Sequence, residues 1–510
     1  MPRQIHRCFG KETDGGKTMT TMTPAPYEGL NLQYIDGAWR SGTSGKTAVD
    51  INPYSGAPLV EIPLAGEEDM EAAMRAARTA QPAWELTPAP DRAAVAYRLA
   101  DIFVRRKEEI IAWLVAESGS TVIKSAIEWS IARQIVLEAA GYPTRLHGRL
   151  LAADVSGKES RIYRKPVGVV AVISPWNFPL HLSMRSIITA LTLGNAVVHK
   201  PASDTPVTGG LLIAKMLEEA GLPPGLFNVV IGSGGDIGDA FAQHPIPRFI
   251  TFTGSTAVGK RLGALVAEAP VLKRAALELG GNSPFAVLDD ADLETAVNAA
   301  IFGKFLHQGQ ICMAINRIIV DEKLYRPFVD RFTERASRLR CGDPSDPGTA
   351  VGPLINEQQK AKLTAVIAGA KAGGARQTLE GRFEGLLLTP HVFADVDPAS
   401  SLAVEETFGP VACIIKAANE AHALAMVNAS QYGLSSAVFT GDPERGVRFA
   451  RKVAAGMAHV NDTPVADLAN APFGGEKNSG IGRFNGDWLL EEMTTPQWIT
   501  VQDKPGRYPF

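Results

Sequence analysis

Short apolar runs alternate with longer helix-like segments along most of this chain, and this alternation limits the possible folds more than any other feature. The runs before residue 280 cover residues 167–173, 196–200, 227–231 and 249–253, with helix-like segments between them at 208–220 and 259–267. Further runs follow at 283–288, 317–320, 411–415 and 436–440. Strands that alternate with helices form βαβ units and parallel sheets. We therefore predict an α/β fold with two parallel-sheet domains in tandem.

The segment before residue 167 is predicted to be mostly helical. Apolar residues recur there at three- and four-residue spacing, which indicates amphipathic helices at residues 67–80, 91–117 and 121–140. Pro82 and the Pro-Ala-Pro sequence at 88–90 are expected to separate the first two helices. The chain around Asp36 and Gly37 is predicted to form a hairpin, and residues 161–166 a half-exposed strand.

Length, charge and cysteine count exclude several classes of protein. A chain of 510 residues can bury a large core, and a net charge of −3 without a long basic run predicts no nucleic-acid partner. No apolar run approaches the ~18 residues of a membrane helix, so no membrane partner is expected. Four scattered cysteines predict no disulfide framework and favour the reducing cytoplasm. Residues 1–24 lack the apolar centre of a signal peptide, and we expect a flexible tail there.

Cys312 is the first candidate for chemistry. It follows a Gly309-Gln310 turn and precedes the apolar run at 317–320, so its thiol can be presented at the end of an element. A cysteine attacks as its thiolate and needs help in losing its proton. A free cysteine is more often a small buried apolar residue, so Cys312 alone does not decide between these interpretations.

Two polar residues elsewhere fit the same chemistry. Asn177 lies in a Pro-flanked loop after a predicted strand, where its amide can donate to an oxyanion or satisfy its own turn. Glu278 lies between leucines and before two glycines, and an apolar setting raises the pKa of a carboxylate toward that of a general base. The alternative for Glu278 is a solvated surface position.

A nucleotide site is suggested more weakly. Lys200 ends one predicted strand, and a glycine-rich turn at 232–238 follows another, where backbone N–H groups could hold phosphates. The glycine spacing is one residue longer than the dinucleotide fingerprint. Glu406 and Phe408 offer a carboxylate and an aromatic face beside a further turn.

These pieces belong to a set of motifs that resembles the NAD(P)-dependent aldehyde dehydrogenases from about residue 30 to the C-terminus. The motifs occur in family order: PWNFP (175–179), KPA (200–202), FTGS (252–255), ELGG (278–281), GQxC (309–312), EETFGP (405–410) and PFGG (472–475).

The resemblance implies a role for each motif. Cys312 would attack the aldehyde, Asn177 and the Cys312 backbone N–H would hold the oxyanion, and Glu278 would activate water. A glutamate in ELGG favours hydrolysis to the free acid over acyl transfer to coenzyme A. No metal is implied. The implied cofactor contacts are Ile173, Trp176, Lys200, Ser203, Gly232, Gly254, Ser255, Val258, Leu279, Glu406 and Phe408.

Ser203 departs from the pattern of many NAD-preferring members, which carry a glutamate after Lys-Pro-Ala. That carboxylate would accept hydrogen bonds from the adenosine ribose and repel a 2′-phosphate. Because Ser203 carries no charge, we expect relaxed use of NAD and NADP.

The context of Asn177 and Cys312 resembles the bacterial benzaldehyde and vanillin dehydrogenases, which implies an aromatic aldehyde substrate. Family position puts six residues around the substrate: Phe178, Arg185, Leu306, Ile311, Met313 and Phe473. Arg185 could contact a ring hydroxyl or form an ion pair within the fold. A broad aliphatic or semialdehyde substrate, and a catalytically silent nucleotide-binding relative, are the alternatives.

The resemblance also implies a division of the chain and an assembly. Residues 25–144 and 167–280 would bind the cofactor, and residues 281–478 would form the catalytic domain. Residues 145–166 and 479–510 would build a subunit interface, so we expect a homodimer or homotetramer.

Overall fold

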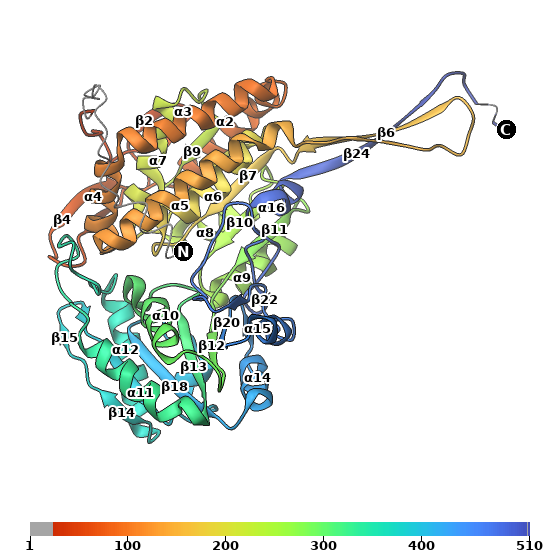
Figure 1. Cartoon of the computed structure of the whole chain (residues 1–510). Helices are drawn as coiled ribbons and strands as arrows, with labels where there is room; N and C mark the ends of the chain where they lie inside the picture. Colours follow the sequence, from red (N-terminus) through yellow and green to blue (C-terminus); the bar gives the residue numbers. More distant parts are fainter. Residues whose placement is uncertain (1–23, 507) are drawn as a thin grey trace, which may run out of the picture.

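The computed structural model describes residues 24–506 and 508–510, so the expected tail at 1–24 lies outside the described residues except for Pro24. Two large β-sheets and a projecting arm dominate the architecture (Figure 1), and small two-stranded sheets accompany them. In the eight-stranded first sheet, the strands from β9 to β11 run parallel. Its order is β2 (Ala38–Arg40), β1 (Gln33–Ile35), β9 (Phe227–Val229), β8 (Ala196–Lys200), β7 (Val169–Ile173), β10 (Phe249–Thr253), β11 (Arg274–Glu278) and β23 (Gly480–Ile481).

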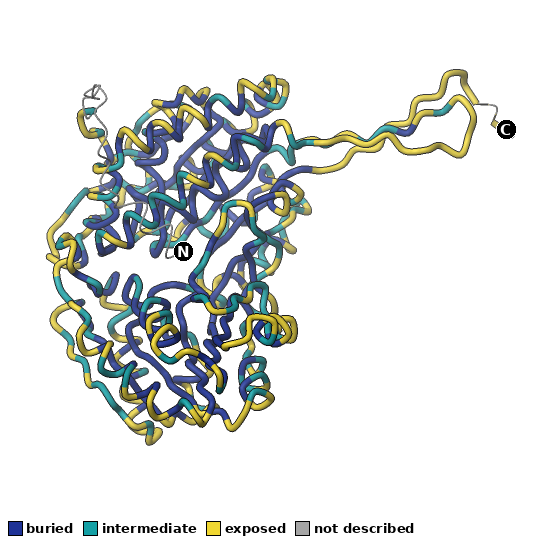
Figure 2. Tube along the Cα trace, viewed as in Figure 1, coloured by how far each residue is buried: buried dark blue, intermediate teal, exposed yellow. Residues whose placement is uncertain are grey.

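The second sheet has seven strands, and all pairs except β14 with β17 are parallel. Its order is β14 (Arg376–Leu379), β17 (His391–Ala394), β18 (Val411–Ala417), β13 (Ile315–Asp321), β12 (Ser283–Val287), β20 (Ala437–Phe439) and β21 (His459–Val460). The predicted α/β class with two parallel sheets is confirmed. The central strands are buried on both faces, which explains their continuous apolar sequences (Figure 2).

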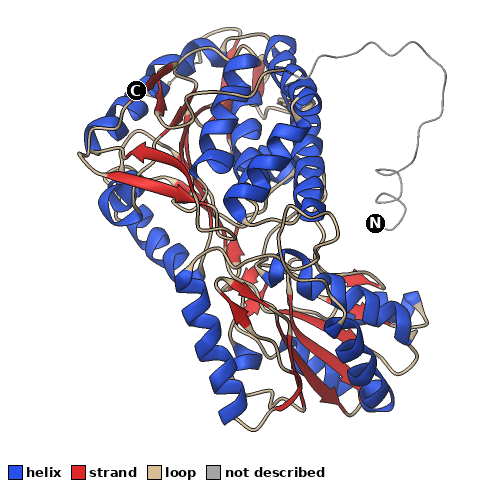
Figure 3. Cartoon of the chain, turned by 90° about the vertical axis from the view of Figure 1, so that its left-hand side faces the viewer, coloured by secondary structure: helices blue, strands red, loops and turns tan. Residues whose placement is uncertain are grey.

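Helices cover both sheets (Figure 3). Every residue of α6 (Pro179–Thr192) is buried, because this helix packs between β7 and β8 of the first sheet and helix α5. The helices are α2 (Glu67–Glu85), α3 (Ala89–Arg105), α4 (Lys107–Ser118), α5 (Val122–Ala140), α6, α7 (Leu212–Glu219), α8 (Gly234–Gln243), α9 (Thr256–Ala267), α10 (Leu293–Phe305), α11 (Glu322–Ser337), α12 (Glu357–Ala372), α13 (Ser401–Val404), α14 (Glu420–Asn428), α15 (Pro443–Ala450) and α16 (Gly486–Glu492). None of the helices in the described part of the chain has the length and apolarity needed to cross a membrane.

Two details of the predicted helices were wrong. Helix α2 does not end before Pro82 but continues to Glu85, because tertiary contacts anchor its last turn: the Trp84 indole donates to the Leu191 carbonyl at 2.7 Å. The predicted helix at 91–117 is two helices, α3 and α4. They break at Arg106, whose guanidinium donates to Glu219 and to Glu109.

The arm consists of β24 (Thr494–Gln502), β6 (Lys158–Pro166) and β5 (Arg149–Leu151), paired antiparallel. It extends away from both sheets, and most of its residues are exposed (Figures 1 and 2). Trp498 is 65% exposed and Leu150 is 81% exposed, so the arm presents apolar side chains that no other described residue of this chain covers. Residues 161–166 were predicted as a half-exposed strand, which β6 confirms.

Candidate active site

One edge of the first sheet gathers four of the motifs. Strands β8, β7, β10 and β11 are neighbours, with Lys200 opposite Ile173 and Glu278 opposite Thr253 in the register. Asn177 follows β7 and Gly254 follows β10. The carboxyl ends of parallel strands meet at one edge, which is where such sheets bind ligands. The motifs that are far apart in sequence are therefore adjacent here.

The second sheet supplies Cys312 from the amino end of one of its strands, whereas the first sheet uses carboxyl ends. Cys312 precedes β13, and the loop before it contains three left-handed residues: His307 (φ 49°), Gln308 (φ 58°) and Gly309 (φ 74°). Gln308 holds this loop by donating to the carbonyls of Pro353 at 2.8 Å and Gly119 at 3.2 Å.

Two close contacts join the loop of Cys312 to the first sheet. The Asn177 amide donates to the Gln310 carbonyl at 2.9 Å, so it lies beside the backbone that carries Cys312. A Cβ on Gly281 would lie 2.1 Å from the Cys312 carbonyl oxygen, so only glycine allows the turn after Glu278 to approach this closely. The three predicted catalytic residues are thus brought together.

Glu278 is fully buried, and neither carboxylate oxygen has a hydrogen bond of ordinary geometry. Burial raises the pKa of Glu278, and the Arg185 guanidinium opposes this increase. Cys312 as a whole is half-buried, but burial of its thiol, followed by the charge of Glu278, raises the thiol pKa well above its usual value. The thiol is therefore protonated at rest, and Glu278 lies beside it as a proton acceptor.

The predicted cofactor side has polar groups that fit a nucleotide with ribose hydroxyls and phosphates. Lys200 is 6% exposed, no carboxylate lies within ion-pair distance of it among the described residues, and burial lowers its pKa to about 8. Glu406 accepts from the Gly281 N–H at 2.8 Å, and burial raises its pKa to about 7. A buried ammonium without a partner is costly unless a ligand satisfies it.

Glycines leave room for the same ligand. Ser233 caps helix α8, and a Cβ added to Gly234 or Gly238 would meet no atom within 4 Å. Open space at a helix N-terminus is suited to a phosphate. The rings of Trp176 and Phe408, two predicted cofactor residues, pack edge to face with their centroids 5.5 Å apart.

Comparison with known proteins gives the family. Residues 39–499 match the model of the aldehyde dehydrogenase family. The chain belongs to this family. It is 50% identical to a vanillin dehydrogenase of Corynebacterium glutamicum over 92% of this chain and 97% of the relative. It is 44% identical to a benzaldehyde dehydrogenase of Bacillus subtilis over 95% of this chain and 99% of the relative.

A solved structure gives the same result in three dimensions. The crystal structure of a NAD-dependent benzaldehyde dehydrogenase from Corynebacterium glutamicum superposes with a TM-score of 0.86 at 47% identity. The match covers 93% of this chain and 98% of that one. The predicted resemblance to the aldehyde dehydrogenases, and to their benzaldehyde and vanillin branch, is confirmed.

In this aldehyde dehydrogenase chain, the residues predicted to surround the substrate are mostly buried. Phe178, Ile311, Met313 and Phe473 are buried, whereas Leu306 is half-buried. Arg185 is fully buried, and its Nη2 lies 3.6 Å from a Glu278 carboxylate oxygen. Three predicted cofactor residues, Ser203, Ser255 and Val258, are exposed.

A cavity of about 390 Å³ lies beside Trp176. Its other lining residues precede or begin helix α12, and no motif in the sequence pointed to them: Ile355, Asn356, Gln358, Gln359 and Lys362. Gln359 donates to the Phe408 carbonyl at 2.6 Å, and Lys362 lowers the pKa of Glu406, so the cavity adjoins the predicted cofactor residues. The only sequence feature that pointed to this region was Asn356, a residue type that favours the start of a helix, and it caps α12.

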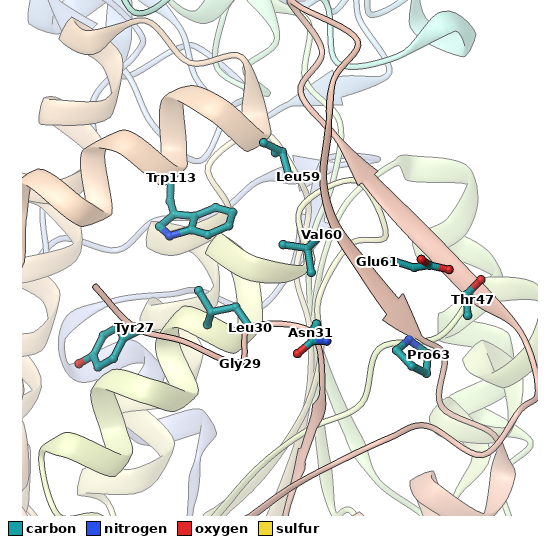
Figure 4. A pocket seen from close by; sticks show the side chains of 10 residues that line it. All are labelled: Tyr27, Gly29, Leu30, Asn31, Thr47, Leu59, Val60, Glu61, Pro63 and Trp113. Atoms are coloured by element: carbon teal, nitrogen blue, oxygen red, sulfur yellow. The ribbon is translucent and has the colours of Figure 1, made fainter. Parts of the chain in front are cut away.

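A larger cavity, of about 630 Å³, lies elsewhere (Figure 4). None of the residues that line it belongs to the motifs: Tyr27, Gly29, Leu30, Asn31, Thr47, Leu59, Val60, Glu61, Pro63 and Trp113. It holds neither a cysteine nor a buried base, so size alone does not identify the site of chemistry. No group of metal-ligating side chains occurs within residues 24–506 and 508–510.

Proposed function

We propose that this protein oxidises an aromatic aldehyde to the carboxylic acid with NAD as the cofactor. The observation that supports this most is the convergence of Cys312, Glu278 and Asn177 from separate elements of two sheets. A nucleophile, a base and an oxyanion donor are the groups that acyl chemistry on a carbonyl requires.

Each residue has a defined task in this proposal. Glu278 accepts the thiol proton, and the Cys312 sulfur forms a bond to the carbonyl carbon, giving a thiohemiacetal. The Asn177 amide and the Cys312 backbone N–H donate to the oxyanion. Nicotinamide, when bound, would accept the hydride that leaves the substrate carbon and so oxidise the thiohemiacetal to the thioester of Cys312. Glu278 first gives up the thiol proton to solvent, and its carboxylate then removes a proton from the water that attacks the Cys312 thioester. That proton passes to the departing sulfur, so the acid and the Cys312 thiol are released.

The proposed cofactor contacts are those of the first sheet together with Glu406 and Phe408. Lys200 and Glu406 would bind ribose hydroxyls, and the N-terminus of α8 would face phosphate. Because Ser203 is exposed and uncharged, we propose that NADP is accepted as well as NAD.

Two observations favour an aromatic substrate. Similar proteins are described as vanillin and benzaldehyde dehydrogenases, and the residues expected around the substrate include the aromatic and sulfur-containing side chains Phe178, Phe473 and Met313, which are buried. Such side chains suit a flat ring. An aliphatic or semialdehyde substrate is the second candidate.

The projecting arm supports an assembly of subunits. Its exposed apolar residues, such as Trp498 and Leu150, would be covered by a second copy, giving a homodimer or a homotetramer. We also propose the division of the chain into a cofactor-binding part (25–144 and 167–280), a catalytic part (281–478) and an interface part (145–166 and 479–510). Since Cys312 must remain a thiol, a reducing cytoplasm suits this enzyme.

The test is the absorbance of reduced nicotinamide for the wild type and Cys312→Ala. Benzaldehyde, vanillin and a short aliphatic aldehyde are each offered with NAD and with NADP. We expect a signal that is strongest on the aromatic aldehydes, present with both cofactors, and lowered at least about 10³-fold by the substitution. Signal on the aliphatic aldehyde alone would discard the aromatic substrate, and no signal in any combination would favour a silent relative.

A further inference from the structure

A buried arginine lies between two buried carboxylates, near enough to Cys312 to act on the charge of its thiol. Arg185 projects from α6, and its Nη2 lies 3.6 Å from Glu278 Oε2. Its Nη1 lies 3.9 Å from Asp467 Oδ2. Arg185 and Glu278 have no exposed side-chain surface, and Asp467 is only 3% exposed. One guanidinium is therefore shared by the base of the proposed reaction and a second acid.

The position of Arg185 is fixed from several sides. Its guanidinium lies 4.7 Å from the ring centroid of Phe473 and 4.2 Å from that of Phe484. Nη2 also donates to the Thr253 hydroxyl at 3.2 Å, and Thr253 is the β10 residue directly opposite Glu278 in the sheet. Stacking on two rings and a bond to the neighbouring strand leave the guanidinium little freedom to leave Glu278.

Asp467 is held separately. Its Oδ1 accepts from the Asn485 amide at 2.6 Å, and the Nε2 atom of His181 lies 3.0 Å from its Oδ2. The His181 contact lacks hydrogen-bond geometry, so its effect is that of a close polar neighbour. These contacts do not involve Glu278, so Asp467 stays near Arg185 whether Glu278 is protonated or ionised.

The contact of Arg185 with Glu278 is electrostatic. At 3.6 Å it is longer than a hydrogen bond, and both Glu278 oxygens remain without a hydrogen bond. The charged or titratable groups that face Glu278 are Arg185, Asp467, the Cys312 thiol and Glu406. Arg185 lowers the pKa of Glu278, whereas Asp467 raises it. A carboxylate held by charge alone keeps its oxygens available to receive a proton.

We infer that Arg185 is a positioning residue that holds Glu278 in place and ionised, and that Asp467 limits this effect by sharing the guanidinium. The inference rests on the proposed role of Glu278 as the base. It explains why a fully buried arginine stands among predicted substrate residues that otherwise suit an apolar ring.

Opposite pH shifts test the inference. In Arg185→Gln, the acid limb of the kcat profile should move up by about one pH unit, because Glu278 loses its stabilising charge. In Asp467→Asn the same limb should move down, because the competing acid is gone. Arg185→Lys should restore part of the shift, since it retains a positive charge.

Any other pattern overturns the inference: no shift, or shifts in the same direction, would mean that Arg185 only supports the fold. If Arg185→Gln does not fold, Asp467→Asn decides alone, and an unchanged or raised limb counts against the proposal. The wild type is measured in parallel. If it does not oxidise aldehydes, the proposed function fails; if it does and the limbs do not move as stated, only this inference fails.

Discussion

The two sheets contribute to the active site from opposite strand ends. The first sheet uses the carboxyl ends of its strands, where Glu278 ends β11 and Lys200 ends β8. The second sheet uses amino ends, where Cys312 precedes β13 and Phe408 precedes β18. The arrangement of the sheets, one above the other in Figure 1, brings these unlike ends together.

The two kinds of strand end also differ in backbone conformation. Glu278 and Lys200 lie on regular strands, whereas the second sheet needs left-handed residues at His307, Gln308 and Gly309, and again at Phe408 (φ 55°). Such conformations cost of order 1 kcal/mol or more for residues other than glycine, and they persist where surrounding contacts enforce them. The base is thus presented on regular strand structure, and the nucleophile is presented at the cost of local strain.

The largest loss of activity is expected for a substitution of Glu278, which lies at the carboxyl end of a regular strand. Glu278→Gln keeps the size of the side chain but removes the base, so kcat should fall by about 10²–10⁴-fold. Hydroxylamine attacks a thioester without help from a base, so adding it should restore part of the turnover. Aldehyde-dependent formation of reduced nicotinamide measures both. Turnover at the wild-type rate in this variant would remove Glu278 from the proposed reaction.

The second largest loss of activity is expected for a substitution in the left-handed loop that precedes Cys312. In Gly309→Ala, the added Cβ would lie 2.5 Å from the Gly409 carbonyl oxygen and would occupy a left-handed residue with φ 74°. We expect activity to fall by about 10–100-fold and the rate of Cys312 alkylation by iodoacetamide to change with it, because the loop must shift by a large fraction of an ångström.

Gly385→Ala is the matched control. Gly385 has φ 61°, and a Cβ there would meet nothing within 4 Å. This variant therefore has the left-handed penalty of about 1–2 kcal/mol without the close contact. Thermal unfolding should show a loss of stability in both variants, but only Gly309→Ala should lose activity. Equal activity losses would mean that the strain at Gly309 has no link to the presentation of Cys312.

The same asymmetry explains how much the sequence could predict. The strands and the residues at their carboxyl ends, such as Glu278 and Lys200, follow from local apolar runs and the general rule for parallel sheets. The Gly309 turn was recognisable, but the left-handed conformation of His307 and Gln308 was not, since neither is glycine. It depends on tertiary contacts such as the bond from Gln308 to Pro353.

Contacts between residues far apart in the sequence also could not be predicted. Asp467 belongs to no motif and lies near Arg185 only after two sheets have packed, so no local pattern could pair them. The cavity residues Gln359 and Lys362 were missed for the same reason. Pro82 misled because proline usually ends a helix, and only the buried contact of Trp84 shows why α2 continues.

The smallest effect concerns Lys200, which tests whether the carboxyl end of β8 holds the cofactor by charge. Below a pKa of about 8 the buried Lys200 is an ammonium, and above it the side chain is neutral. The KM for NAD should therefore rise as the pH passes through 8. Lys200→Met should raise this KM by about tenfold at pH 7 and remove its pH dependence.

The stability of the folded protein should increase with pH over the range in which the affinity for NAD decreases. Because burial lowers the pKa of Lys200 in the folded protein, the unfolded chain binds more protons between pH 8 and the ordinary lysine value of about 10.4, and the free energy of unfolding rises with pH there. Lys200→Met should remove this slope and raise stability at pH 7, since an unpaired buried charge is gone.

Lys273→Met is the control for both measurements. Burial also lowers the pKa of Lys273 to about 8, but this lysine precedes the amino end of β11, the opposite end from Glu278, and donates to the Ala242 carbonyl at 3.0 Å. It should alter the stability slope and leave the KM for NAD unchanged. If Lys273→Met changed that KM as much as Lys200→Met, the effect would come from the overall charge of the protein, and Lys200 would have no direct part in holding the cofactor.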